Sequence, residues 1–325
     1  MLSTKFALLI PCCALAAATA WLVSRGFPFL NAVVISLCVG AVLGGMLVFG
    51  TGKRLEDLQK LLIARPARVF AIIAALFVLH LLYAIATNTA RPQRLSVMAL
   101  YLSFPFLLLT KQRGESKATW LDLAAILWMW LPLELGLVRR LTVGSSANAD
   151  FHYAFAEGLA INVGIIAFGA WRRLRGIGYR FEFSRTTVSV GLICFLLFAA
   201  TAVPLGFAIH FIRYSFQLNK LIFAPATFLG IFLFTAIPEE LLFRGLIQNC
   251  LERMAGRRIL GLMLASVVFG ASHLNNGPPI PNYKYFFMAS VAGIFYGIAW
   301  QRTHSLTASG VTHALVDTAW SVLFR

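Results

Sequence analysis

The chain has 325 residues, of which 59% are hydrophobic and 12% are charged. Soluble domains are about 45–50% apolar and about 25% charged, so this composition excludes a soluble globular protein. The 28 Lys and Arg against 12 Asp and Glu give a net charge of +16. Because the basic residues lie in short gaps between long apolar runs, the charge indicates a polytopic membrane protein and no nucleic-acid partner.

A helix needs about 20 mostly apolar residues to cross a bilayer. The sequence divides into eleven such segments almost end to end, which predicts an all-α, polytopic transmembrane helix bundle. Their approximate bounds are 6–24, 29–49, 69–87, 95–110, 120–138, 153–171, 186–207, 221–238, 259–273, 285–300 and 305–324.

Lys and Arg are distributed unevenly over the connections between these segments. Eighteen fall in the connections on the side of the N-terminus, and nine, among them Arg139, Arg140 and Arg325, fall on the other side. Arg244 lies inside a segment. Positive residues are enriched in cytoplasmic loops, so the distribution predicts a cytoplasmic N-terminus and a C-terminus on the outside.

Ionisable side chains within a membrane segment cost a few kcal/mol each, by order of magnitude, so each one needs an explanation. The first seven segments contain few of them: Asp122, Glu134, Glu157 and His80. The three acids lie near segment ends, where interfacial placement or a local ion pair explains them. A single hydrogen bond between helices would satisfy the imidazole of His80.

The last third of the chain is different, because acids and imidazoles recur there in three separate segments. One segment carries Glu239, Glu240 and Arg244, the next ends at His273, and the last contains His313 and Asp317. Glu240 and Arg244 are four residues apart, as are His313 and Asp317. Residues four apart share one face of a helix, and Glu239, His273 and His313 lie at similar depths in their segments. A network that only fixes helix packing is the alternative, but packing does not require this many ionisable groups.

Helix geometry predicts separate roles for the two adjacent glutamates. Glu240 can pair with Arg244 on the same helix, whereas Glu239 is rotated by about 100° and is free to face a cavity. Pro238 lacks a backbone donor, so it either kinks this helix or starts a new one beside Glu239. A carboxylate in a cavity of low dielectric can accept a proton from water, and a neighbouring imidazole can share it. Ser272 adjoins His273, but neighbours on a helix point in different directions, which disfavours a serine nucleophile.

Taken in order, Glu239-Glu240-x-x-x-Arg244, Phe269-x-x-x-His273 and His313-x-x-x-Asp317 resemble the motifs of the CAAX-protease and bacteriocin-processing (CPBP, or ABI) family of intramembrane proteases. The resemblance covers about 219–325. It implies a four-helix catalytic core over 219–325, preceded by a transmembrane region of about seven helices over 1–218 without an assigned role. It also suggests a multi-pass protein of the bacterial inner membrane.

The family implies an endopeptidase that hydrolyses a peptide bond near a membrane-anchored C-terminus; its eukaryotic members remove the last three residues of prenylated CAAX proteins. The expected partners are membrane lipid and a protein or lipidated peptide substrate. Carried over, Glu239 activates water with help from His273, while His313 and Asp317 stabilise the oxyanion. The third family motif often ends in Asn, and an Asp donates a hydrogen bond only when it is protonated. The supporting residues are Glu240, Arg244 and Phe269.

Cofactor use and two other functions remain open at this point. Glu239, His273, His313 and Asp317 are also a chemically suitable set for a divalent metal such as zinc, but no HExxH motif is present, and we favour metal-free hydrolysis. A proton- or cation-coupled transporter would use the same buried groups as a relay, but the first half of the sequence lacks matching polar, broken helices. A catalytically idle scaffold or immunity protein is the third alternative, and the intact motifs argue against it. The Pro-rich segment 274–282 after His273 either borders the site or is an ordinary connection.

Overall fold

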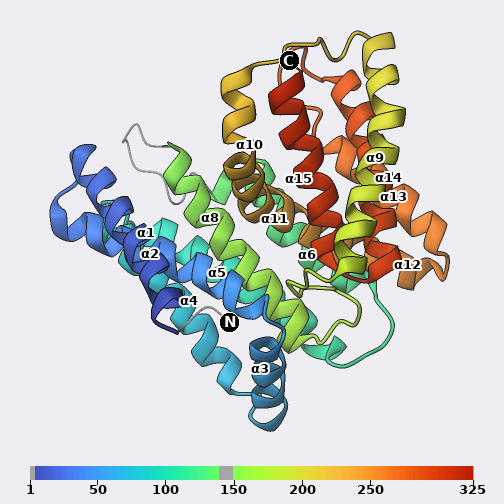
Figure 1. Ribbon diagram of the computed structural model, residues 1–325. Helices are drawn as coiled ribbons and strands as arrows, with labels where there is room; N and C mark the ends of the chain where they lie inside the picture. Colours follow the sequence, from blue (N-terminus) through green and yellow to red (C-terminus); the bar gives the residue numbers. More distant parts are fainter. Residues whose placement is uncertain (1–3, 139–148, 325) are drawn as a thin grey trace. The chain divides into compact units, whose positions relative to one another are not determined.

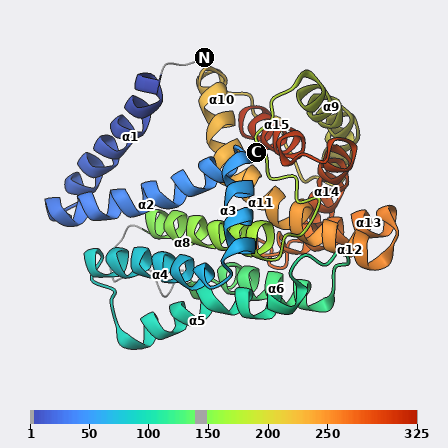
Figure 2. The ribbon, with the colours of Figure 1, turned by 90° about the horizontal axis from the view of Figure 1, so that it is seen from below.

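The computed structural model describes residues 4–138 and 149–324 (Figure 1, Figure 2). Within these ranges the chain is a bundle of α-helices without a β-strand, as the apolar segments predict. The only strand-like pairing among the described residues is one isolated bridge between Tyr214 and Phe324. Arg139, Arg140 and Arg325, which entered the charge distribution, lie outside the described residues.

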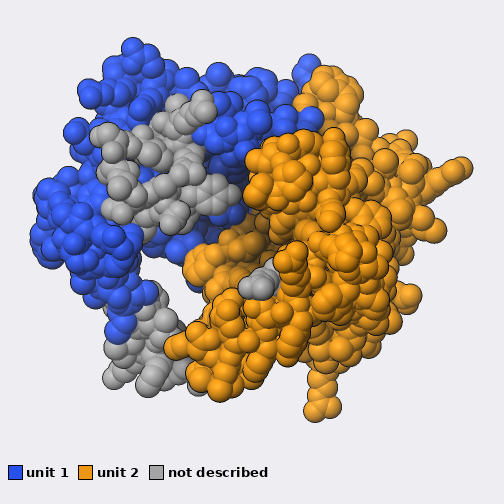
Figure 3. All heavy atoms as spheres, turned by 90° about the horizontal axis from the view of Figure 1, so that it is seen from above, with its two compact units in different colours: residues 1–113, 127–172 blue, residues 114–126, 173–325 orange. Residues whose placement is uncertain are grey.

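The chain divides into two compact units, which Figure 3 shows in different colours. Unit 1 comprises residues 1–113 and 127–172, and unit 2 comprises 114–126 and 173–325. The helix α6 (Trp120–Glu134) begins in unit 2 and ends in unit 1. The division at residue 218 that the family resemblance implies stays a prediction.

Unit 1 is built around the apolar helix α2, which packs against α1, α4 and α8. A buried polar contact supports this packing, because the side-chain amide of Asn162 donates to the carbonyl of Val42 at 2.7 Å. The elements are α1 (Thr4–Ser24), α2 (Phe29–Phe49), α3 (Lys53–Ala64), α4 (Arg68–Ala86), α5 (Pro92–Leu109), the 3₁₀ turn η1 (Thr110–Gln112), α8 (Ala149–Gly164) and the π-helical η2 (Ile165–Trp171).

The polar residues of the first segments have mostly local partners. Asp122 lies in the first turn of α6 and accepts from the backbone N–H of Thr119 at 2.8 Å, and Glu134 at its end accepts from Trp130 Nε1 at 3.2 Å. His80 is different, because it is fully buried in α4 and neither ring nitrogen has a hydrogen-bond partner within 4–138 or 149–324. The single hydrogen bond expected for this imidazole is therefore not formed among the described residues.

Unit 2 contains α9 (Arg185–Ala208), which packs along both α14 (Tyr283–Thr303) and α15 (Leu306–Leu323), and α14 also packs on α13 (Arg258–Ala271) (Figure 1). One continuous helix, Leu218–Ala255, completes it. Its parts are α10 (Leu218–Ile231), the π-helical η3 (Phe232–Ala236), α11 (Ile237–Glu240), the π-helical η4 (Leu241–Gln248) and α12 (Asn249–Ala255).

Pro238 lies within the uninterrupted Leu218–Ala255 helix and does not start a separate one. It lies in the first turn of α11, and a π-helical stretch precedes and follows that turn. A π-helix bonds each N–H to a carbonyl five residues back, so it changes the local register while the helix continues past a residue that has no N–H. The two glutamates thus sit on a short α-helical turn between two π-helical stretches, and π-helical stretches are frequent at functional sites.

Five helices are long and apolar enough to cross a membrane, namely Phe29–Phe49, Arg68–Ala86, Pro92–Gln112, Arg185–Ala208 and Leu218–Ala255. Shorter apolar helices lie at Cys13–Ser24, Phe155–Trp171 and Arg258–Ala271. Each of the eleven predicted segments coincides with a helix, so the expected all-α membrane bundle is confirmed. The helix α3 was not among them, since it lies in a polar connection. The orientation of the N-terminus stays a prediction.

The loop before α9 holds the turn between α14 and α15 in place. Leu306 N donates to the carbonyl of Gly178 at 3.0 Å, and Thr307 Oγ1 donates to the carbonyl of Arg180 at 2.9 Å. Gly178 has φ +73°, and a Cβ at this position would come within 2.7 Å of the His304 carbonyl oxygen. Only glycine fits such a backbone, so the loop fixes the start of the helix that carries His313.

Candidate active site

The second glutamate of the pair is fully buried and bound to the arginine of the same helix. Nε of Arg244 lies 3.1 Å from Oε2 of Glu240, which is the ion pair that the four-residue spacing predicts. The guanidinium carbon lies 4.7 Å from the ring centre of Phe269 and 5.5 Å from that of Tyr296. Aromatic faces attract a cation, so these rings surround the part of the guanidinium that Glu240 does not reach.

Glu240 is also the contact between this helix and α15. The hydroxyl of Ser309 donates to Glu240 Oε2, and Nδ1 of His313 lies 2.9 Å from Oε1. Both oxygens of the carboxylate are therefore engaged by an arginine, a hydroxyl and an imidazole. Sequence reasoning missed Ser309, although its position four residues before His313 places it on the same face of the helix.

The other ring nitrogen of His313 faces the two remaining acids. Nε2 lies 3.5 Å from Oδ2 of Asp317 and 3.8 Å from Oε2 of Glu239. The His313 side chain is only 4% exposed, whereas those of Glu239 and Asp317 are 31% and 37% exposed. The imidazole is thus the buried centre of the cluster, and the two acids are its accessible side.

His273 lies just beyond the C-terminal end of α13. Its Nδ1 is 2.8 Å from the carbonyl oxygen of Phe269, and a carbonyl can only accept, so Nδ1 carries the proton in this contact. In the neutral ring, Nε2 is then an acceptor. The Ser272 hydroxyl donates to the same carbonyl at 2.7 Å, which leaves it poorly placed as a nucleophile. Among the described residues, His313 is the imidazole at ion-pair distance from Glu239, and the predicted partnership of Glu239 with His273 stays a prediction.

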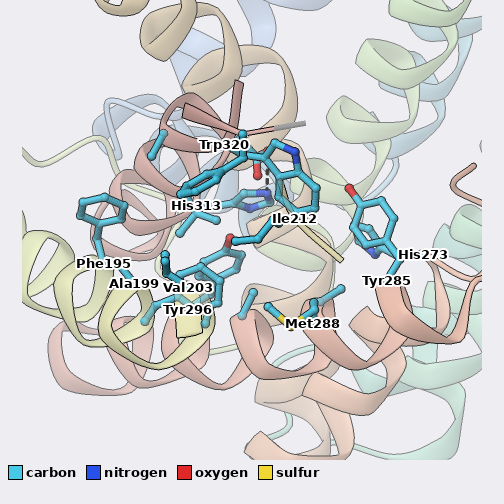
Figure 4. Close-up of a pocket in the computed structure, with 18 of the residues that line it drawn as sticks. Phe195, Ala199, Val203, Ile212, His273, Tyr285, Met288, Tyr296, His313 and Trp320 are labelled. Carbon is cyan, nitrogen blue, oxygen red and sulfur yellow. Dashed lines mark ion pairs between the residues drawn. The ribbon is translucent and has the colours of Figure 1, made fainter. Parts of the chain in front are cut away.

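A cavity of about 330 Å³ connects the four predicted residues, because Glu239, His273, His313 and Asp317 all line it. Its volume falls within the range of about 300–1,000 Å³ of small-ligand sites. Figure 4 shows His313 next to Tyr296, and His273 next to Tyr285, around this space. Asn276 also lines it, so the Pro-rich segment borders the cavity through this residue.

Much of the cavity wall is apolar and comes from α9, the segment that follows it and the end of α15. The contributing side chains include Phe195, Phe198, Ala202, Ile212 and Trp320. Sequence reasoning did not assign these residues to the site, because α9 reads as an ordinary apolar segment without a polar motif. The cavity therefore joins a polar, acid-rich side to an apolar side.

Metal binding would require the acid and imidazole cluster to rearrange. Among the described residues, no group of three or more His, Cys, Asp and Glu side chains is arranged to hold a metal ion. His313 directs one ring nitrogen to Glu240 and the other toward Glu239 and Asp317, so binding a metal would require it to give up one of these contacts.

The fold and the site define a helical membrane protein with a buried acid and imidazole cluster at a mainly apolar cavity. Residues 221–319 match the family model described as type II CAAX prenyl endopeptidase Rce1-like. The chain thus carries an Rce1-like domain, which is consistent with a CPBP family protease. In general terms, this domain supports the assignment of a CAAX-protease-like intramembrane endopeptidase activity. No curated protein and no solved structure matches the chain. The match includes the four predicted residues, whereas α9 lies outside it.

Proposed function

We propose that the protein hydrolyses a peptide bond near the membrane-anchored C-terminus of a protein or lipidated peptide, with water activated by Glu239 and His273. One observation carries this proposal: the four predicted catalytic residues line one cavity, and most of the other residues that line it are apolar. The acids and imidazoles suit general acid and base chemistry. The apolar wall suits the membrane-anchored part of a substrate.

Glu239 is the better general base of the two glutamates. Glu240 is engaged by Arg244, Ser309 and His313, whereas Oε2 of Glu239 has no hydrogen-bond partner in the described part of the chain. A general base must lie within hydrogen-bond reach of the proton that it accepts. The Glu239 side chain lines the cavity, so a water molecule bound there would be within its reach, and His273 lines the same cavity as a second candidate acceptor.

His313 and Asp317 are proposed to face the carbonyl oxygen of the scissile bond. Since Nδ1–H of His313 donates to Glu240, Nε2 donates as well only when the ring is an imidazolium. Asp317 as a carboxylate accepts and does not donate. In the metal-dependent alternative, a zinc ion held by Glu239, His273, His313 and Asp317 would polarise the same carbonyl as a Lewis acid.

The proposal can be tested with purified protein in liposomes and an internally quenched peptide that ends in a prenylated CAAX sequence. The wild-type protein should cleave it, and Glu239→Gln and His273→Ala should reduce cleavage by at least about 100-fold, as expected for loss of a general base. Glu182→Gln removes an exposed acid from the loop before α9 and serves as the matched control. Normal cleavage by correctly inserted Glu239→Gln and His273→Ala would contradict the assignment.

The same assay separates the metal-free mechanism from the metal-dependent one. Pre-incubation with 1,10-phenanthroline should leave the rate unchanged if Glu239 and His273 activate water directly. Loss of activity that added zinc restores would instead support the metal-dependent alternative. A peptide of the same sequence without the prenyl group shows whether the apolar side of the cavity needs a lipid chain.

A further inference from the structure

Tyr296 lies in the middle of α14 and places its ring against the central histidine. The two rings are nearly parallel, with centroids 4.5 Å apart and planes 17° apart (Figure 4). Tyr296 is 2% exposed and lines the cavity together with Tyr285, Ala289 and Ala292 of the same helix face. The aromatic ring is therefore fixed between the protein core and the acid-rich side of the cavity.

The hydroxyl of Tyr296 makes no hydrogen bond with any residue that the structure describes. Two other buried tyrosines do: the Tyr83 hydroxyl lies 2.7 Å from Nδ1 of His152, and Tyr101 donates to the Met129 carbonyl at 2.9 Å. A buried tyrosine usually finds a partner for its O–H. We therefore expect the hydrogen-bond partner of the Tyr296 hydroxyl to be a molecule that binds in the cavity.

The cavity side of His313 faces acceptors, whereas the other donor side chains that line the cavity include those of Thr235, Asn276, Tyr285 and Trp320. Glu239 and Asp317 are acids, and Nε2 of His313 lies between them. Arg244 is committed to Glu240 and to the surrounding rings, and it does not line the cavity. An oxyanion that forms here needs a preorganised donor. A phenol O–H can donate while remaining neutral near the carboxylates.

We infer that the hydroxyl of Tyr296 donates a hydrogen bond to the oxyanion of the tetrahedral intermediate, a role that Asp317 as a carboxylate cannot perform. This inference rests on the proposed function. Water gives a proton to Glu239 as its oxygen bonds to the carbonyl carbon, and the π electron pair moves to the carbonyl oxygen. That oxygen accepts from Tyr296 O–H. When the pair returns, the C–N bond breaks and the nitrogen takes the proton from Glu239, while Tyr296 keeps its own proton throughout.

Tyr285 is the other tyrosine that lines the cavity, but it lies beside His273 and not beside His313. Its ring lies 4.9 Å from that of His273 and 5.7 Å from that of Trp320. It therefore belongs with the group that is proposed to activate water. Tyr296 is the one in ring contact with His313, where the carbonyl oxygen is proposed to lie.

The test is Tyr296→Phe, which removes only the hydroxyl and retains the ring against His313. Cleavage of the quenched prenylated peptide should show kcat lower by about 100-fold with KM unchanged, as for loss of one oxyanion donor. A merely structural role would change KM or the thermal midpoint as well. Tyr101→Phe removes a buried hydroxyl in unit 1 and should leave kcat unchanged. Asp317→Asn introduces an amide donor, so adding it to Tyr296→Phe should restore part of kcat.

A second measurement does not depend on turnover. A phosphinate analogue of the same peptide carries a tetrahedral anion in place of the scissile amide. Tyr296→Phe should weaken phosphinate binding by at least about 10-fold, which corresponds to one hydrogen bond to a charged group, and should leave binding of the amide peptide unchanged. Equal phosphinate affinity of the wild-type and Tyr296→Phe proteins would overturn the inference. Absence of cleavage by the wild-type protein would instead contradict the proposed function, and phosphinate binding would still test Tyr296.

Discussion

Nδ1 of His313 lies 2.9 Å from Oε1 of Glu240, although the two residues are 73 positions apart in the chain. This contact joins the helix α15 to the helix that carries the two glutamates. The orientation of the imidazole is thus fixed by the second glutamate of the pair. The first glutamate remains available to the cavity. This contact favours the proposed division of roles, in which Glu240 positions His313 and Glu239 is the general base.

Removing Arg244 should destabilise the protein strongly. Arg244→Leu leaves the fully buried Glu240 without its cation, and breaking a buried pair in this way costs about 3–5 kcal/mol. We expect a lower thermal midpoint in detergent, measured by intrinsic tryptophan fluorescence. Glu240→Gln should also destabilise, since it leaves the arginine unpaired.

The double variant Glu240→Gln with Arg244→Leu separates the cost of an unpaired buried charge from the cost of lost packing. No unpaired charge remains in it, so it should be more stable than Arg244→Leu alone. Additive losses in the double variant would show that the ion pair contributes no coupling energy.

The contact between α9 and α15 depends on a glycine. A Cβ at Gly191 would come within 2.8 Å of the backbone oxygen of Ala308, and the Gly191 carbonyl accepts from Thr312 Oγ1 at 3.0 Å. Gly191→Ala should therefore lower the free energy of unfolding by about 1–3 kcal/mol through overpacking. Gly230→Ala is the matched control in α10, because a Cβ there meets nothing within 4 Å and should stabilise the helix by about 1 kcal/mol. Equal thermal midpoints for the two variants would refute the close approach.

The apolar wall of the cavity should control substrate binding. Ala202 of α9 is 4% exposed and lines the cavity, so Ala202→Phe fills part of the space with a benzyl group. KM for the prenylated peptide should rise by at least about 10-fold, which corresponds to 1.4 kcal/mol of lost binding, while kcat changes little. Ala200→Phe adds the same group to the exposed face of α9 and should leave KM unchanged. A fall in kcat with constant KM would contradict a binding role for this wall.

The orientation in the membrane can be tested with two engineered cysteines. Lys60 and Arg91 are both exposed, and the charge distribution places the first on the cytoplasmic side and the second outside. In a cysteine-free background, a membrane-impermeant maleimide applied to intact spheroplasts should label Arg91→Cys and not Lys60→Cys. The reverse pattern would show that the N-terminus lies outside.

Patterns within one helix were accessible from the sequence. The apolar segments predicted the helices, because a membrane helix must satisfy its own backbone hydrogen bonds over about 20 residues. The spacing of Glu240 and Arg244 predicted their ion pair, because helical periodicity places residues four apart on one face. The sequence left open whether Pro238 kinks the helix or starts a new one. The π-helical stretches around it were not predicted, since they depend on the surrounding packing.

Relationships between helices were decided only by the tertiary structure. The sequence placed acids and imidazoles in three segments, but it did not show that His313 is the ring nearest to Glu239, that Ser309 binds Glu240, or that Tyr296 stacks on His313. Neither did it show that α9, which lies outside the matched family region, forms the apolar wall of the cavity. The physical reason is that helical periodicity fixes which side chains share a face, whereas the packing of small and large residues between helices fixes which faces meet.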